Sequence, residues 1–109
     1  NPAIAPIKCA VLPLLKNKEE LTKAALDIFN HLKFSVDCQY DDKDAIGRRY
    51  RRQDAIGTPF CITVDFETLE NQTVTIRDRD TLKQERIPIK DIERIVLEKT
   101  DMRLLFAKI

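Results

Sequence analysis

The sequence predicts a single α/β domain built on a mixed β-sheet. A strand, a helix and a second strand follow one another over residues 7–40, which is typical of a right-handed βαβ unit with parallel strands. Two later stretches, 60–66 and 73–77, alternate between apolar and polar residues and are joined by a polar turn, which indicates an antiparallel hairpin. At 109 residues the chain is long enough for one hydrophobic core but not for two.

The first strand is expected at residues 7–12, a mostly apolar run that is closed by Pro13 and is consistent with burial on both faces. A helix should begin at Asn17, because Glu20 follows three residues later in the manner of a capping box. Its apolar residues recur at the helical period and form one stripe: Leu21, Ala24, Ala25, Ile28 and Leu32. Alternation over residues 36–40 then predicts the second strand.

The next expected helix carries an arginine-rich run. It follows a charged loop at residues 41–44, from which an aspartate is expected to cap the helix. It should end near Gly57, since Pro59 blocks its continuation. Ile46 and Tyr50 share one face of this helix. Four arginines occupy its other positions: Arg48, Arg49, Arg51 and Arg52.

The second half of the chain is expected to complete the sheet. The strand that begins at Phe60 should extend to Phe66, and residues 68–72 should form the polar turn of the hairpin. Residues 84–87 are a candidate fifth strand, after which Pro88 opens a last helix. The apolar residues on one face of that helix are Ile89, Ile92, Ile95 and Val96. We assign the domain to residues 1–100 and leave the conformation of the tail, residues 101–109, undetermined.

Composition limits the function classes. The net charge is only +1, so binding of nucleic acid would require a local basic patch. No apolar run is long enough to span a membrane and no signal peptide is recognisable, so we expect a cytoplasmic domain from a longer protein. Each of the three cysteines falls within a predicted strand and none forms a Cys-x-x-Cys pair, which indicates buried thiols rather than a zinc site.

Two arginine clusters are the candidate binding elements. The run 46–60 places four guanidinium groups around Tyr50, and the run 77–80 alternates arginine with aspartate. Guanidinium groups hold phosphates and hydrogen-bond to base acceptors, while a carboxylate accepts from the amino group of a cytosine. Such base edges are accessible in unpaired RNA loops. The residues alone leave open that these charges form only surface salt bridges, worth about 0–1 kcal/mol each, or a solvated helix face.

Residues 45–61, followed by 63–68 and 75–80, closely resemble the C-terminal anticodon-binding domain of glycyl-tRNA synthetases of the homodimeric kind, in a version that looks bacterial. The resemblance covers the chain from about Ala5 to the helix at Ile89. It implies a three-layer domain, shared with other class IIa synthetases, in which three helices flank a five-stranded mixed sheet. It also implies binding to the anticodon stem-loop of glycine tRNA, whose second and third anticodon bases are cytosines.

The resemblance also implies roles for particular residues. Those expected to contact the anticodon are Glu67, Arg77, Asp78, Arg79 and Arg86. Those expected to hold phosphates are Arg48, Arg49 and Arg52. The parent enzyme is implied to be a homodimer that attaches glycine to its tRNA with ATP and Mg²⁺ in a separate catalytic domain of the same chain. The present domain is implied to have no catalytic residue, cofactor or metal, and no activity alone.

Two alternatives remain at this point. One is a non-catalytic adaptor or polymerase accessory domain with the same fold, which would tolerate loss of the Arg/Asp motif at residues 77–80. The other is a small metal-dependent nuclease that would use Asp41, Asp42, Asp44 or Asp65. The nuclease is disfavoured because these acids lack the ordered spacing expected of a metal-dependent site.

Overall fold

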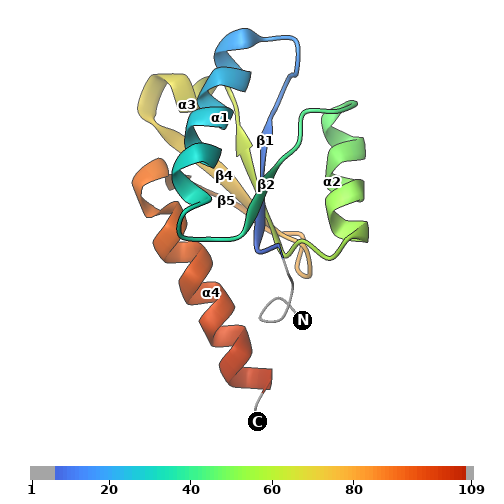
Figure 1. The fold of residues 1–109 in the computed structure, drawn as a ribbon, viewed down its shortest axis with the longest axis vertical. Helices are drawn as coiled ribbons and strands as arrows, with labels where there is room; N and C mark the ends of the chain where they lie inside the picture. Colours follow the sequence, from blue (N-terminus) through green and yellow to red (C-terminus); the bar gives the residue numbers. More distant parts are fainter. Residues whose placement is uncertain (1–6, 108–109) are drawn as a thin grey trace.

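The computed structural model describes the backbone of residues 7–107 and the side chains of residues 7–100 (Figure 1). Its centre is a five-stranded sheet in the order β2-β1-β3-β4-β5. β1 pairs in parallel with β2 and β3, while β3–β4 and β4–β5 are antiparallel. The predicted α/β class, the parallel unit and the mixed sheet are therefore confirmed. The strands are β1 (Cys9–Pro13), β2 (Cys38–Tyr40), β3 (Phe60–Val64), β4 (Thr73–Asp78) and β5 (Gln84–Pro88).

The helices lie on both faces of the sheet. Figure 1 shows α2 by itself on one side and α1, α3 and α4 on the other. The main hydrophobic core lies between the sheet and the second group and includes Val11, Ile28, Ile62 and Val96. The helices of the described chain are α1 (Glu19–Leu32), α2 (Ile46–Ala55), α3 (Phe66–Asn71) and α4 (Ile92–Ala107), with a short 3-10 helix, η1 (Ile89–Asp91), before α4.

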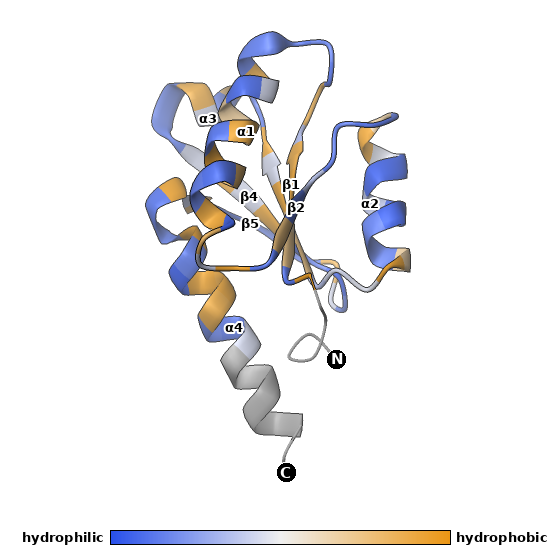
Figure 2. Ribbon diagram, in the orientation of Figure 1, coloured by the Kyte–Doolittle hydropathy of each residue, from blue (hydrophilic) through white to orange (hydrophobic). Residues whose placement is uncertain are grey.

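The contact under α2 is small and leaves part of the sheet uncovered. Ala10, Leu12 and Cys61 form a second apolar cluster, against which Ile46 and Tyr50 of α2 pack. Figure 2 shows that α2 is hydrophilic along most of its length. Because this cluster involves only β1 and β3, α2 packs no apolar cluster against the same face of β4 and β5.

The predicted start of α1 and the predicted cap of α2 are wrong. α1 begins at Glu19, not Asn17, and its N-cap residue Lys18 makes no side-chain hydrogen bond to the helix. Glu19 and Glu20 instead place carboxylates in the first turn, where the positive end of the helix dipole favours them. No aspartate caps α2, whose N-cap is Ala45. The predicted end of α2 is confirmed, and Gly57 supplies the positive φ, 84°, that the turn into β3 requires.

The segment expected to be a strand end and a turn is instead a helix. β3 stops at Val64, and Phe66 and the residues after it form α3 rather than the polar turn of a hairpin. Asp65 initiates α3 through a capping box, in which it accepts a hydrogen bond from the Thr68 amide while the Thr68 hydroxyl binds the Asp65 amide. The sheet therefore carries a fourth helix within the described residues.

The C-terminal region also differs from expectation in its detail. Pro88 is the last residue of β5 and precedes η1, which leads directly into α4. α4 continues without a break through residue 100 to Ala107, so the backbone of the tail is helical up to that residue. Residues 1–6 and 108–109 lie outside the described part of the chain.

Candidate nucleic-acid interface

A polar surface lies on the part of the sheet that α2 leaves uncovered. Residues directly opposite each other in antiparallel strands present their side chains on the same face. Cys61, which packs under α2, pairs with Arg77, and Arg77 pairs in turn with Gln84. Thr75 pairs with Arg86 by the same rule. The α2 side of β4 and β5 is therefore lined by hydroxyl, amide and guanidinium groups rather than by apolar side chains.

Arg77 lies at the centre of this surface. Its two terminal nitrogens donate to the two carboxylate oxygens of Asp54, at 3.0 and 3.1 Å. Its guanidinium carbon also lies 4.9 Å from the centre of the Tyr50 ring. The Tyr50 hydroxyl shares a 2.6 Å hydrogen bond with the Thr63 hydroxyl, and burial raises the pKa of Tyr50. The guanidinium is thus held from one side by a carboxylate and from another by an aromatic face.

The two arginines of the Arg/Asp motif both bind Asp54, and Arg79 also pairs with Asp80 in the turn after β4, at 3.3 Å. Arg79 extends its Nε to the backbone carbonyl of Asp54, at 2.9 Å, and so lies beside Arg77. The Asp78 carboxylate instead accepts from the backbone amides of Asp80 and Thr81 and stabilises the turn. Asp78 also pairs with Phe60, which places it on the opposite face from Arg77. The motif therefore contributes its arginines to the polar surface, whereas Asp78 stabilises the turn.

Arg86 forms the other end of the surface. It donates to Asp65 at 2.5 Å, pairs with Glu67, and donates to the Thr73 hydroxyl at 3.0 Å. Burial alone would raise the pKa of Asp65, but hydrogen bonds from Arg86 and from the Thr68 amide and hydroxyl outweigh it and lower that pKa. Glu67 and Arg86, both expected to contact the anticodon, are thus in direct contact with each other.

The arginines of α2 divide into buried and exposed groups. Arg49 is 1% exposed and donates to the backbone carbonyls of Pro13, Leu14 and Asp41. A guanidinium in that position is not accessible to a phosphate, so Arg49 belongs to the scaffold. Arg52 is half-exposed and pairs with Asp41 and Asp44, at 2.7 and 2.5 Å. Arg48 is exposed and has no polar partner among the described residues.

A buried polar network connects α2 to the ends of β2 and β3. The Asp41 carboxylate accepts hydrogen bonds from Arg52 and from the Gln53 amide. Gln53 is 1% exposed and accepts in turn from the Thr58 hydroxyl at 2.8 Å. Burial would raise the pKa of Asp41, but the hydrogen bonds outweigh it and the pKa is lowered. Much of the arginine-rich motif therefore positions α2.

The remaining candidate groups do not form a second polar site. Cys9 and Cys61 are buried and Cys38 is half-buried, and burial raises the pKa of Cys61 to about 12. The described residues contain no group of three or more His, Cys, Asp or Glu side chains that could hold a metal ion.

Within the described residues, no helix has the length and apolar character needed to cross a membrane.

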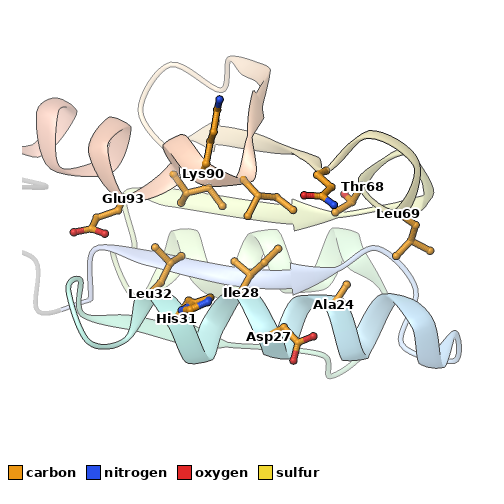
Figure 3. Close-up of a pocket in the computed structure, with 12 residues that line it drawn as sticks. Ala24, Asp27, Ile28, His31, Leu32, Thr68, Leu69, Lys90 and Glu93 are labelled. Atoms are coloured by element: carbon orange, nitrogen blue, oxygen red, sulfur yellow. The ribbon is translucent and has the colours of Figure 1, made fainter.

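A groove of about 520 Å³ lies on the opposite side of the sheet, between α1, α3 and the start of α4 (Figure 3). Ile28 and Leu32 of α1 line its floor, and His31 lies along its α1 side. The groove lies on the face of the sheet opposite α2, away from Arg77.

A family model described as the anticodon binding domain matches residues 8–99, most of the chain. The chain belongs to the anticodon-binding domain family. This anticodon-binding domain is 54% identical over 99 residues to a glycine–tRNA ligase of Clostridium kluyveri, covering 91% of the chain and 21% of that protein. It is 61% identical over 92 residues to a glycine–tRNA ligase of Malacoplasma penetrans, covering 84% of the chain and 19% of that protein.

Solved structures give the same fold. A prolyl-tRNA synthetase from Cryptosporidium parvum superposes with a TM-score of 0.83 at 26% identity, and the match covers 97% of this chain and 24% of that one. The chain spans about a fifth of the length of the curated relatives it matches. The family assignment and the five-stranded sheet are therefore confirmed for the described domain.

Sequence reasoning missed one residue of this anticodon-binding domain that holds two of its arginines. Asp54 was not singled out, although its side chain binds Arg77 and its carbonyl binds Arg79. The only sequence signal was its place in the last turn of an expected helix, where the negative end of the dipole attracts cations. The contact of Asp54 with β4 depends on how α2 docks on the sheet, and local sequence patterns do not predict that docking.

Proposed function

We propose that this chain is the anticodon-binding domain of a glycine–tRNA ligase, and that its polar sheet face receives the anticodon loop of glycine tRNA. The observation that carries this proposal is the identity of 54–61% to glycine–tRNA ligases over at least 84% of the chain. The geometry supports it, because the arginines of β4 and β5 lie on the sheet face that carries only α2 among the described helices, and α2 buries no apolar cluster against those two strands.

Arg77, Arg79 and Arg86 are proposed to contact anticodon bases, with Glu67 as an acceptor for a cytosine amino group. An unpaired base can stack on a guanidinium or aromatic plane while its edge is bound by polar side chains. Arg77 is 13% exposed and Arg86 is 30% exposed, so both reach the surface despite their carboxylate partners. Asp78 is left out of this set because it stabilises the turn.

The phosphate contacts are proposed to come from the outer side of α2. Arg48 is the first candidate because it is exposed and has no polar partner among the described residues. Arg52 would contribute by reorienting from its two aspartates, and Arg49 is excluded by its burial. Phosphate contacts position an RNA and dominate the salt dependence of its binding, but they do not report its sequence.

The parent protein is proposed to be a cytoplasmic homodimer that uses ATP and Mg²⁺ to attach glycine to its tRNA. That chemistry is assigned to a catalytic domain elsewhere in the same chain. The present domain would contribute binding energy and tRNA selection, which position the acceptor end for reaction. It is therefore expected to bind RNA without any catalytic activity of its own.

A titration of anticodon stem-loops tests the proposal. The 109-residue chain is titrated with the glycine stem-loop and with versions in which each anticodon cytosine is replaced in turn. We expect each replacement at a contacted position to weaken binding by about 1–3 kcal/mol, in addition to a general dependence on salt. Equal affinity for all loops would contradict anticodon recognition and would favour a non-catalytic adaptor. An RNA cleavage assay with Mg²⁺ checks the nuclease alternative.

A further inference from the structure

We propose that Asp54 is the positioning residue for base recognition, because it orients the Arg77 guanidinium so that donors remain free for the acceptor edge of an unpaired cytosine. The inference rests on the proposed function and adds the residue that determines its specificity. Asp54 lies in the last turn of α2, 23 residues before Arg77 in sequence. It would act through Arg77 without touching the base itself.

The first support is the geometry of the ion pair. Asp54 binds both terminal nitrogens of Arg77, with one carboxylate oxygen on each. A two-point contact of this kind fixes the plane of the guanidinium, whereas a single hydrogen bond would leave it free to rotate. The Tyr50 ring lies 4.9 Å from the guanidinium carbon and limits movement from the plane. The tyrosine is itself fixed to β3 by its bond to Thr63.

The second support is the set of donors that remain. An arginine side chain has five N–H donors, and the contact with Asp54 uses two of them. The Nε–H, together with one N–H on each terminal nitrogen, therefore remains available. A fork of two such donors matches two neighbouring acceptors, which is what the N3 and O2 atoms of a cytosine present. An unpaired uracil presents N3–H instead of an acceptor and would meet this fork poorly.

The third support is that Asp54 also holds Arg79, through a different group. The backbone carbonyl of Asp54 accepts from the Arg79 Nε at 2.9 Å. Replacing the Asp54 side chain would therefore release Arg77 while the acceptor for Arg79 persists. This separation makes the positioning role of the carboxylate measurable.

The stabilising value of the Arg77–Asp54 pair is expected to be small. The two side chains are 13% and 30% exposed, and partly exposed ion pairs contribute little to folding because water and salt screen them. We therefore expect the Asp54→Asn variant to fold like the unsubstituted chain. Its effect should appear in the discrimination between RNA loops.

The experiment compares Asp54→Asn with the unsubstituted 109-residue chain. Affinities are measured for the glycine stem-loop and for loops in which one anticodon cytosine is replaced by uracil. We expect Asp54→Asn to reduce the preference for cytosine at one position by about tenfold or more. In the Arg77→Ala background, Asp54→Asn should change the preference by less than about twofold, since both substitutions remove the same interaction.

Asp44→Asn is the matched control, because Asp44 precedes α2 and pairs with an arginine other than Arg77, namely Arg52. It should leave the cytosine preference unchanged. If Asp54→Asn melts before binding can be measured, Arg77→Lys replaces it, since lysine keeps the charge but cannot form the two-point contact. Arg77→Lys should then lose the same preference.

Three outcomes would overturn the inference. In the first, Asp54→Asn keeps the full preference for cytosine. In the second, it weakens the binding of all loops by the same factor. In the third, it reduces the preference for cytosine further in the Arg77→Ala background. An unsubstituted chain that shows no preference for any loop would overturn the proposed function, and the inference with it. The unsubstituted chain is measured first, so the two failures are distinguishable.

Discussion

Arg48 and Arg49 are adjacent in α2 but differ in environment: Arg48 is exposed, whereas Arg49 is 1% exposed and bound to backbone carbonyls. The buried guanidinium joins α2 to the end of β1 through Pro13 and Leu14. Burial of a charged group is costly unless its donors find acceptors, and the carbonyls at the end of β1 supply them for the two terminal nitrogens of Arg49. Its buried Nε has no hydrogen-bond partner among the described residues. Neighbouring arginines of one motif therefore have different physical roles.

Arg49→Met is expected to lower the free energy of unfolding by about 1–3 kcal/mol, because it leaves the buried carbonyl acceptors without donors. Urea denaturation measures the change, and Arg48→Met is the control because both variants lose one arginine. The control should change stability by no more than about 0.5 kcal/mol, as is usual for exposed positions. Equal stability of the two variants would show that the buried contacts contribute nothing.

Arg48→Ala is expected to weaken binding of every anticodon stem-loop by a similar factor and to leave the cytosine preference intact. A phosphate contact carries no base information, and its loss should reduce the slope of log affinity against log salt concentration by about one. Titrations at several salt concentrations measure this slope. A reduced preference for cytosine in this variant would instead place Arg48 at a base.

Asp41 is expected to make stability depend on acid pH. Burial opposes its ionisation, but hydrogen bonds from Arg52 and other donors lower its folded pKa. Its unfolded pKa is about 3.9, so the stabilisation is fully present above that value and is lost as pH falls through the folded pKa. Urea denaturation between neutral pH and about pH 3 should therefore show that the free energy of unfolding falls more steeply with pH in the unsubstituted chain than in Asp41→Asn.

The control for this pH dependence is Arg52→Met, which removes the main hydrogen-bond donor to Asp41. In that background, Asp41→Asn should have a smaller effect on the slope of stability against pH. If stability fell with pH along the same slope in Asp41→Asn and in the unsubstituted chain, the partners of Asp41 would not lower its pKa.

The elements with strong local patterns could be predicted from the sequence. The stripe of α1 is confirmed, with Leu21, Ala25, Ile28 and Leu32 all buried. β1 is buried at all five positions, as its apolar run predicted. α3 was missed because it has only six residues and because its capping box uses Thr68 where the usual signature has Glu or Gln. Six residues are too few for a helical period to be recognised.

The partners of Arg77 and Arg86 could not be predicted, because they come from elements far apart in sequence. Arg77 binds Asp54 and Arg86 binds Asp65, across 23 and 21 residues respectively. Arg52 turns to the loop before α2, where Asp44 has a positive φ of 64° that no pattern indicated. Residue type alone indicated that the arginines are important. The docking of α2 and the strand register are needed to distinguish the arginines that hold the fold together from those that lie on the polar surface.

Asp65 combines two roles that one pair of variants should separate. It caps α3 by accepting from the Thr68 amide at 3.1 Å, and it pairs with Arg86 at 2.5 Å. Asp65→Ser keeps a capping oxygen but loses the charge, whereas Asp65→Ala loses both. Because loss of an N-cap costs about 1 kcal/mol, Asp65→Ala should be less stable than Asp65→Ser by about that amount in urea denaturation.

The RNA titration separates the second role from the first. Both variants lose the Asp65–Arg86 pair, although Glu67 and the Thr73 hydroxyl still bind Arg86. Their affinities for the glycine stem-loop should therefore change by the same factor, even though their stabilities differ. If affinity instead followed stability, with Asp65→Ala the weaker binder, then α3 itself rather than the orientation of Arg86 would govern this end of the polar surface.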